Sequence, residues 1–456
     1  MARKSVLIVG GGTAGWLAAT VLHKKYDVQL VESQTVPTIG VGESTTETVM
    51  DALREADVDL NDFVNSCNAT PKYGVLFDGW AEKNYFHPFG ENFLEKQYGP
   101  EDCIDFLTKC YKTGRDVAQL TPYTHMAEKG IYPLFDSDEE FFNDVALHWQ
   151  AGAVPEYLKN FLKGKIKHSY DTIKGIHSDK FGITSVQGEE NSYNAHYYID
   201  CTGGARMLSK ELGIEWKKWT NDTPLDSALT YSRDPDPNTF YTRATAWDNG
   251  WEWSIPLQDR MQHGYVYSSK HSTREQAAEE IRRRRGDVEI LNEVHFQPGV
   301  LSKVADKNMI SIGLSAHFIE PLEATNIELT VIMAKEFDKA IEENDIGFTK
   351  LNKRLLSYIE EIKEFVIFHY SLPNKTGKFW KDIYKQYDES DIVDRQQIYP
   401  WHIFNWYSVA QGINFDTTQY DNVDVEVDYF TSEFEKERKV AELERMESET
   451  RGLSQT

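Results

Sequence analysis

The chain of 456 residues has few cysteines, and it contains no long apolar run. Its four cysteines, at positions 67, 103, 110 and 201, show no C-x-x-C spacing, so we expect free thiols in a reducing compartment. No apolar stretch approaches the roughly 20 residues that a membrane-spanning helix needs. The first ten residues lead directly into a glycine turn, which predicts a strand and no secretory signal. We therefore expect a cytoplasmic protein.

Positive charge and metal-ligand spacings are also scarce. The 13 histidines contain no H-E-x-x-H arrangement, so no metal site is predicted. Lys and Arg number 49 against 73 Asp and Glu, a formal net charge of -24, which disfavours nucleic acid and anionic membranes as partners. The one basic run, Arg282 to Arg285, follows Glu279 and Glu280 on a predicted helix, a pattern typical of a solvated, ion-paired face.

The N-terminal segment has the pattern of a dinucleotide-binding unit. A predicted strand, Ser5 to Val9, leads into a glycine-rich turn and then into a helix-forming segment, Trp16 to His23. A second predicted strand, Val28 to Val31, ends in an acidic residue that can accept a hydrogen bond from a ribose hydroxyl. Glycines let the backbone approach a pyrophosphate, and the helix N-terminus supplies N–H groups. The residues expected to bind the dinucleotide are Gly10, Gly12, Thr13, Ala14, Gly15 and Glu32.

Two further segments favour FAD over NAD. The sequence P-T-I-G-V-G-E-S-T at Pro37 to Thr45 could form a second loop around an extended cofactor. A predicted strand, Tyr197 to Asp200, leads into Cys201-Thr202-Gly203-Gly204, where small residues can meet a ligand. No second G-x-G-x-x-G is present, so we expect no separate domain for a nicotinamide nucleotide.

A pair of tryptophans stands in the segment G-W-E-W-S-I-P, Gly250 to Pro256. Side chains alternate along a strand, so Trp251 and Trp253 are predicted on one face and Glu252 on the other. The pair can be a core face or the aromatic wall of a site, and the pattern alone allows both.

Six ordered motifs carry a resemblance to a known family. They are the glycine-rich opening, the G-V-G-E of Gly40 to Glu43, the segment Thr70 to Gly74 followed by Phe77 and Trp80, the H-P-F of His87 to Phe89, the W-x-W-x-I-P of Trp251 to Pro256, and Gly313 to Thr325. In these motifs the chain resembles the flavin-dependent halogenases of the tryptophan-halogenase type.

This resemblance implies an α/β fold. It would contain an FAD-binding Rossmann-like domain of the glutathione-reductase and flavin-monooxygenase type, an interwoven sheet layer and a helical C-terminal region covering the substrate. We expect residues 1–325 to form the discontinuous FAD-binding domain with the inserted sheet layer, and residues 326–456 to form the helical region. Along the chain we expect helices within 51–67, a helix near 138–150, strands over 166–200 and 225–269, a returning strand at 309–314 and an exposed helix at 433–451.

The resemblance also implies an activity. Reduced FAD and oxygen would form a flavin hydroperoxide that oxidises a halide to hypohalous acid, and the acid would halogenate an electron-rich aromatic, indole-like or phenol-like small molecule. A separate NAD(P)H-dependent flavin reductase would supply the reduced flavin, and a homo-oligomer is compatible with the family. The alternatives are a flavin-dependent aromatic monooxygenase, which shares the fold type, and a non-catalytic flavin-binding scaffold.

By resemblance, Lys72 would relay the hypohalous acid, and Glu323 would stabilise the substrate cation and take its proton. Glu320 is the alternative carboxylate, and we favour Glu323 because it matches the family motif. His87 and Phe89 would face the substrate, while the two tryptophans would shield the flavin. The expected cofactor contacts extend to Gly42, Glu43, Ser44, Thr202, Gly313 and Leu314.

The halide is expected at Thr325 and Asn326, because helix N-termini bind anions. The family's E-S-T-G is replaced here by Glu323-Ala324-Thr325-Asn326, which leaves chloride, bromide and iodide all open. The segment Phe365 to Trp380, with His369 and Tyr370, also resembles the family's C-terminal portion. Trp401 to Trp406 can line the pocket or pack in the core.

Overall fold

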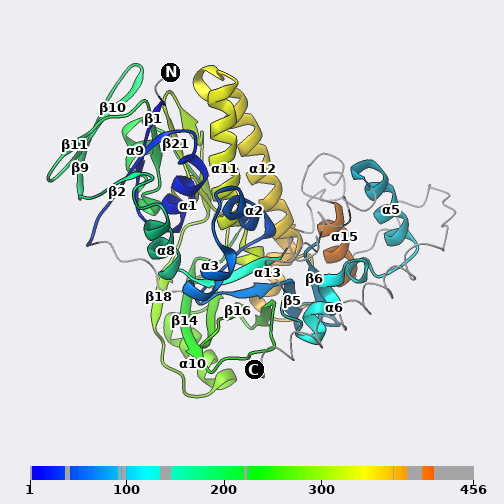
Figure 1. Cartoon of the computed structure of the whole chain (residues 1–456). Helices are drawn as coiled ribbons and strands as arrows, with labels where there is room; N and C mark the ends of the chain where they lie inside the picture. The colour runs from blue at the N-terminus through cyan, green and yellow to red at the C-terminus, as the bar shows by residue number, and fades with distance from the viewer. Residues whose placement is uncertain are drawn as a thin grey trace, which may run out of the picture.

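Two large sheets form the centre of the molecule (Figure 1). The structure is a computed structural model, and it describes residues 3–35, 42–90, 94, 99–133, 145–219, 223–372, 374–387 and 403–414. A six-stranded sheet, named here the parallel sheet, has the order β20-β21-β12-β1-β2-β8. A seven-stranded mixed sheet has the order β18-β14-β17-β16-β15-β5-β6.

The parallel sheet contains the expected N-terminal unit. Strand β1 (Ser5–Val9) pairs in parallel with β2 (Asp27–Glu32) and β12 (Tyr197–Asp200), and β12 pairs in parallel with β21 (Met309–Ser311). Their near-continuous apolar runs suit strands that are covered on both faces. Helix α1 (Thr13–Leu22) connects β1 and β2 and begins three residues earlier than the sequence predicted. The returning strand predicted at 309–314 is present as β21, but it ends at Ser311 and a 3-10 turn follows at Gly313–Ser315.

The mixed sheet carries the tryptophan pair on β16 (Gly250–Pro256), which lies between β15 (Thr242–Trp247) and β17 (Met261–Tyr267). Trp251 and Trp253 face the main core, and Glu252 faces the opposite side, as predicted. There Glu252 meets Tyr231 and Arg285. The other strands of the sheet are β5 (Gly74–Asp78), β6 (Tyr85–Pro88), β14 (Ser227–Arg233) and β18 (Asn292–His295).

One predicted helix is wrong. Residues 146–150 form strand β7 (Ala146–Gln150), which pairs antiparallel with β3 (Gly42–Ser44) and β4 (Thr70–Lys72). The paired residues Glu43 and Trp149 lie 106 positions apart, and Thr70 and His148 lie 78 apart, so the pairing that satisfies the β7 backbone has no local sequence signal. Residues 138–144 of the expected helix lie outside the described residues.

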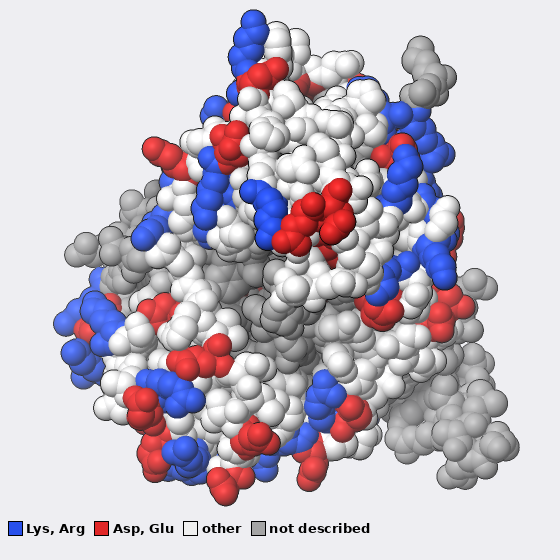
Figure 2. All heavy atoms as spheres, turned by 90° about the vertical axis from the view of Figure 1, so that its left-hand side faces the viewer, with Lys and Arg blue, Asp and Glu red and all other residues white. Residues whose placement is uncertain are grey.

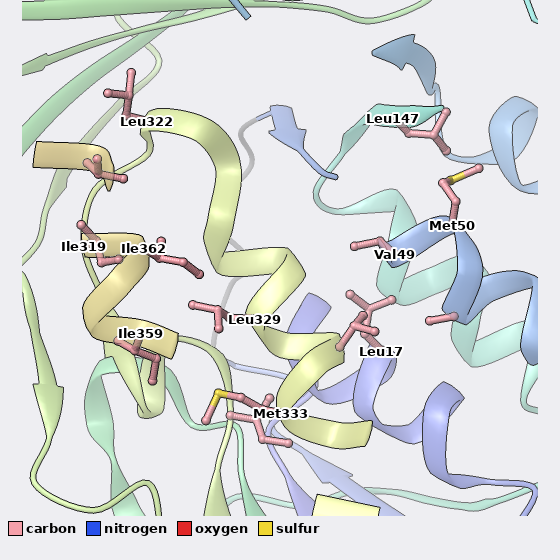
Figure 3. Close-up of a cluster of buried hydrophobic side chains, with 14 of the residues drawn as sticks. Leu17, Val49, Met50, Leu147, Ile319, Leu322, Leu329, Met333, Ile359 and Ile362 are labelled. Carbon is pink, nitrogen blue, oxygen red and sulfur yellow. The ribbon is translucent and has the colours of Figure 1, made fainter. Parts of the chain in front are cut away.

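The core continues on both sides of helix α11 (Thr325–Glu342). On one side α11 packs against α1 and α2 (Glu47–Glu55), and on the other against α12 (Thr349–Phe368). Figure 3 shows Leu329 and Met333 of α11 between side chains of these neighbouring helices. The N-terminal ends of α2 and α11 are therefore held by apolar packing. The division of the chain at residue 325 stays a proposal.

The remaining elements surround the two large sheets, and α5, α6 and α15 lie in the right-hand part of Figure 1. The strands are β8 (Lys167–Tyr170), β9 (Ile173–Asp179), β10 (Gly182–Gly188), β11 (Ser192–Tyr193), β13 (Trp216–Lys218), β19 (Gly299–Leu301), β20 (Ala305–Asp306) and β22 (His317–Phe318). The helices are α3 (Leu60–Ser66), α5 (Pro100–Lys112), α6 (Pro122–Lys129), α8 (Ala153–Phe161), α9 (Met207–Glu211), α10 (Arg274–Arg285), α13 (Lys378–Tyr387) and α15 (Ile403–Gly412). Short 3-10 turns are η1 (Val117–Leu120), η2 (Gly203–Ala205), η3 (Gly313–Ser315), η4 (Leu322–Ala324) and η5 (Ile346–Phe348).

Lysine and arginine side chains are interspersed with acidic ones on the face shown in Figure 2. The basic run lies at the end of α10, where Arg283 and Arg284 pair with Asp248 while Arg285 reaches the buried Glu252. The predicted ion-paired face is thus present, and one of its arginines also neutralises an interior carboxylate. No helix among the described residues is long and apolar enough to span a membrane. The helix expected at 433–451 lies outside the described residues.

Candidate functional site

The glycine turn after β1 brings backbone segments very close together. Gly10 has a φ of 116°, and a Cβ there would lie 2.2 Å from the carbonyl oxygen of Cys201. A Cβ on Gly15 would lie 1.9 Å from the carbonyl oxygen of Gly10. A Cβ on Gly12, which precedes the first turn of α1 at Thr13, would meet no atom within 4 Å. The turn therefore packs tightly on its protein side and is open at the helix N-terminus, a geometry that fits a pyrophosphate.

Glu32 lies at the end of β2 and next to this turn, as predicted. Its Oε1 lies 2.8 Å from Nε2 of His168, and its Oε2 would be only 1.6 Å from a Cβ at Gly11. Glycine at position 11 is therefore required for the carboxylate to lie over the turn. A ribose hydroxyl would have to share this carboxylate with His168, a partner that sequence reasoning did not identify.

The second loop is attached to the glycine turn through Glu43. Thr13 Oγ1 donates to Glu43 Oε2 at 3.0 Å, and the Trp149 indole donates to the same oxygen at 2.7 Å. Burial raises the pKa of the Glu43 carboxyl, although both donors oppose the rise. Ser44 lies next to it with its hydroxyl 3.3 Å from that of Thr242, and Gly42 pairs with Gln150 in the sheet. Glu43 thus joins α1 to the loop, of which residues 36–41 lie outside the described part.

Asp200 holds the third expected cofactor segment together. Its fully buried carboxylate accepts from the Thr202 hydroxyl at 2.6 Å, from the amides of Leu208 and Ser209 at 2.9 and 3.1 Å, and from Ser315 Oγ at 3.2 Å. Sequence reasoning missed this residue, although a single acid at the end of a buried strand is a usable signal.

The neighbouring turn η3 starts at Gly313, whose φ is 66° and where a Cβ would lie 2.7 Å from that of Ala14. Leu314 follows it and is 43% exposed. The structure therefore brings Ala14, Thr202 and Gly313 together around the N-terminus of α1.

Lys72 is fully buried at the end of β4, where a lysine without a function is unusual. Its Nζ donates to the carbonyl oxygen of Thr45 at 3.0 Å and lies 4.4 Å from the centre of the Phe89 ring. Burial lowers the pKa of Lys72 to about 8, although the carboxylates of Glu323, Glu47 and Glu328 oppose this shift. The amine and the ammonium are therefore both accessible near neutral pH.

Glu323 lies between two histidines and is also buried. Its Oε1 is 3.0 Å from His87 Nδ1 and 3.1 Å from His369 Nε2. Burial alone would raise the pKa of the Glu323 carboxyl, but the charge of His87 and the hydrogen bonds from both histidines outweigh it and hold this pKa far below its usual range. Glu323 is therefore a fixed negative charge.

The backbone at Glu323 is held in the left-handed region, with φ of 64° there and 60° at Ala324. Such a conformation costs about 1–3 kcal/mol for a residue other than glycine and persists at functional sites when its surroundings enforce it. Helix α11 then begins at Thr325, so its first N–H groups point toward this bend. The Thr325 hydroxyl and Asn326 Oδ1 are buried without a hydrogen-bond partner among the described residues. The hydroxyl can donate to an anion at the helix terminus, and the amide oxygen can accept a hydrogen bond from a water molecule there.

His87 and Phe89 lie beside Glu323 and Lys72, respectively, and we call the space between these four residues the chamber. His87 Nε2 lies 3.0 Å from Asn405 Oδ1 on α15, and the rings of His87 and Phe89 meet edge to face at 6.4 Å. Trp406, the described end of the segment expected to line the pocket, packs instead on Phe365 at 5.3 Å. Asn405 is the residue of this segment that reaches the chamber, and its amide gave no sequence signal.

The tryptophan pair is part of the main core. Trp251 and Trp253 meet edge to face at 6.3 Å, and a Cβ on Gly264 would lie 1.9 Å from the Trp253 ring. Trp251 also approaches Trp80, with ring centres 6.3 Å apart. Core packing is thus established, and shielding of a flavin stays a proposal.

The ligand atoms of His87, Glu323 and His369 lie within 4.8 Å of one another, a spacing that could hold a metal ion. The same atoms already form two hydrogen bonds, and the nearby charge of Lys72 disfavours a divalent cation. We therefore interpret the three residues as a hydrogen-bonded group that shares protons.

Comparisons with known proteins agree with this geometry. The family model for tryptophan halogenase matches residues 5–424. Tryptophan 6-halogenase SttH from Streptomyces toxytricini is 30% identical over 424 residues, covering 83% of this chain and 80% of its own. Tryptophan 7-halogenase RebH from Lentzea aerocolonigenes is 27% identical, covering 82% and 78% of the two chains.

Solved structures show the same fold. The crystal structure of SttH superposes with a TM-score of 0.76 at 26% identity, covering 91% of this chain and 90% of that one. Tar14, a tryptophan C-6 flavin-dependent halogenase from taromycin biosynthesis, gives a TM-score of 0.82 at 25% identity, covering 98% and 97%.

Proposed function

Because the chain belongs to the tryptophan halogenase family of flavin-dependent enzymes, we propose that it halogenates an electron-rich aromatic small molecule at the chamber between Lys72 and Glu323. The observation that carries this proposal is the burial of both side chains in one chamber, with Glu323 the strongest carboxylate influence on the charge of Lys72. A lysine with only a surface role, or a glutamate that only caps a helix, would not need to be buried in this way.

The family implies FAD and a halide. We propose that the cofactor is held by the glycine turn, Glu32, the Glu43 loop and the segments at Thr202 and Gly313, and that the halide lies at Thr325 and Asn326. Bound as FADH2, the cofactor would supply two electrons that activate O2, and O2 would supply the oxidising equivalents that convert the halide to hypohalous acid. A separate NAD(P)H-dependent flavin reductase would provide the reduced cofactor. The relatives named above act on tryptophan, and we extend this to an indole-like or phenol-like substrate.

Lys72 can hold the hypohalous acid beside the substrate ring. Its ammonium donates to Thr45 and has two further N–H groups for the acid, and its position over Phe89 keeps it inside the chamber. As the ring carbon bonds to the halogen, the oxygen–halogen bond breaks and the departing hydroxide takes a proton from the ammonium. Burial strengthens each of these interactions.

Glu323 would stabilise the positive ring and remove its proton. Its carboxylate is ionised and fixed by two donors, so it is already oriented when the ring becomes charged. A carboxylate of low pKa is a weak base, but a protonated arene is a strong acid and still transfers its proton to it. The adjacent imidazoles can share that proton afterwards.

The test is a mass-spectrometric screen of indoles and phenols with FAD, a flavin reductase, NADH and oxygen, with chloride, bromide and iodide in separate reactions. We expect a halide-dependent mass increase that Lys72→Ala abolishes while FAD binding and peroxide release persist. Lys159→Ala, at a surface ion pair on α8, is the matched control and should keep full activity.

Halogenation that survived in Lys72→Ala would disprove the role of the lysine. Oxygen insertion without halogen would favour an aromatic monooxygenase. FAD binding without turnover of any arene in the presence of reductase would favour the scaffold alternative.

A further inference from the structure

A small cavity lies beside Glu323 at the N-terminal ends of two helices. Its lining includes Thr46 and Glu47 at the start of α2, Glu328 in the first turn of α11, and His87, Phe89 and Glu323. The cavity measures about 20 Å³, room for one water molecule or for one ammonium head group. No part of the cofactor-binding or lysine machinery described above uses Glu47 or Glu328 as a contact.

Glu328 is the unexplained group in this cavity. Its side chain is buried, with 4% of the residue exposed, and its Oε2 has no hydrogen-bond partner in the part of the chain that the structure describes. The carboxyl also receives a long contact of 3.5 Å from the Thr48 hydroxyl to Oε1 and a hydrogen bond from Tyr358. The Thr46 hydroxyl, in the same cavity, is also buried without such a partner. Burying a polar oxygen without a hydrogen-bond partner destabilises the folded protein, and more so when the group is charged.

The helix terminus does not account for Glu328. A carboxylate in the first turn is favourable when it is exposed, and this gain is smaller than the cost of burying Glu328 with Oε2 unpaired. The apolar contacts of Leu329, Val49 and Met50 hold both helix ends in place, so the two carboxylates cannot easily turn to solvent (Figure 3). The cavity is lined by three carboxyl groups, and the single nearby lysine, Lys72, cannot pair with all of them.

We propose that Glu47 and Glu328 bind a protonated amine on the aromatic substrate, so that the substrate class is an arene carrying a cationic group. The inference rests on the proposed function, because it places that arene beside Glu323. An ammonium group has three donors, which suit Glu328 Oε2, the Glu47 carboxylate and the Thr46 hydroxyl. An arene carrying a carboxylate would meet repulsion at the same place.

The charge state of Glu328 agrees with this assignment. Burial and the neighbouring Glu47 raise the pKa of Glu328 to about 8, while Lys72 and hydrogen bonds from Thr48 and Tyr358 oppose the rise. The Glu328 carboxyl therefore holds a proton near neutral pH, and an ammonium ion would take the place of that proton. Binding of an amine should strengthen between pH 6 and pH 8.5, as the carboxyl ionises.

The test measures binding alone, with FAD-loaded protein and with neither halide nor reductant. The probes are tryptamine, tryptophol and indole-3-propionate, which share a ring and differ in charge, together with phenethylamine, 2-phenylethanol and 3-phenylpropionate as a smaller-ring series. Titration calorimetry gives the dissociation constants. In at least one series we expect the amine to bind about ten to a hundred times more tightly than the alcohol, and the acid to bind weakest.

The substitutions Glu328→Gln and Glu47→Gln keep the side-chain shape and remove the charge. Each should weaken amine binding about tenfold or more and leave alcohol binding within about twofold. Glu342→Gln and Glu55→Gln, exposed at the far ends of the same two helices, are the matched controls and should change nothing.

Equal affinities of amine and alcohol in both series, or preserved amine selectivity in both glutamine variants, would overturn the assignment. These outcomes do not depend on turnover, so they differ from a failure of halogenation. If amines bind selectively and no arene is halogenated, the proposed function fails and the cationic subsite stands.

Discussion

Glu320 and Glu323 are two buried glutamates three residues apart, and the regions around them set opposite charge states. Glu323 receives hydrogen bonds from two imidazoles, which hold its pKa far below the usual range. Glu320 receives the Tyr370 hydroxyl at 2.8 and 3.0 Å, and burial raises its pKa to about 8. The ring of Tyr370 packs in turn on the rings of Trp80 and Trp380.

The difference shows that the neighbours of a carboxyl, more than its depth, decide what it can do. A phenol donor in an aromatic region leaves Glu320 neutral, whereas two donors that can carry charge keep Glu323 ionised. Only the second carboxylate is prepared to face a cation. The choice of Glu323 over Glu320, made from sequence by resemblance, is thus favoured by a separate physical argument.

The largest effect should come from removing the charge of Glu323. We expect Glu323→Gln to slow halogenation by about 10² to 10³ fold, because a neutral amide neither stabilises the charged ring nor accepts its proton. Glu320→Gln, the matched change three residues away, should cost less than about tenfold. Product formation in a single turnover at equal FAD content measures both. Similar losses in the two variants would mean that the difference in charge state between Glu320 and Glu323 has no role in the reaction.

A smaller effect should follow from removing one donor. In His369→Gln the carboxyl of Glu323 loses one hydrogen-bond donor, so its pKa should rise toward the usual range. Because an ionised Glu323 is needed, activity should then fall at the acid end of the pH profile, where the wild type keeps its activity. His177→Gln, at an exposed position on β9, is the control. A uniform loss at every pH would show that His369 acts only through packing.

The smallest effect concerns stability. The pKa of Glu320 is raised in the folded state, so the folded protein binds a proton that the unfolded chain releases above about pH 4.5. Stability should therefore fall as pH rises toward 8, and Glu320→Gln should flatten this fall because the amide does not titrate. The melting temperature from pH 5 to pH 8.5 measures it. Parallel curves for wild type and variant would show that Glu320 is ionised in both states.

The first βαβ unit and the face assignment of the tryptophan pair were predictable, because each depends on local periodicity and on spacing within a short segment. Strand β7 was not, because its partners are Gly42–Ser44 and Thr70–Lys72. The resemblance named Lys72 and Glu323 but could not show their environment. His369 was identified only as part of an aromatic segment, and its contact with Glu323 joins residues 46 positions apart.

Asp200, Asn405 and the pair Glu47 and Glu328 carry no motif of their own. Their importance depends on which distant segments surround them. Asp200 is surrounded by α9 and η3, Asn405 depends on α15 against β6, and the two glutamates depend on α2 against α11. The chemical role of such a residue can be recognised only when its burial and its hydrogen-bond partners are known.

The bond from Lys72 to Thr45 limits how the lysine can move. Thr45 makes three hydrogen bonds with Leu147 of β7. Its amide and its hydroxyl donate to the Leu147 carbonyl oxygen at 2.9 and 3.0 Å, and the Leu147 amide donates to the Thr45 hydroxyl at 2.9 Å. The carbonyl group that accepts from the lysine is therefore held firmly in place. The lysine stem can therefore pivot while its anchor stays still, and releasing it breaks one hydrogen bond worth about 1 kcal/mol. If the lysine carries the oxidant as proposed, it can deliver it only to atoms within reach of this anchored side chain.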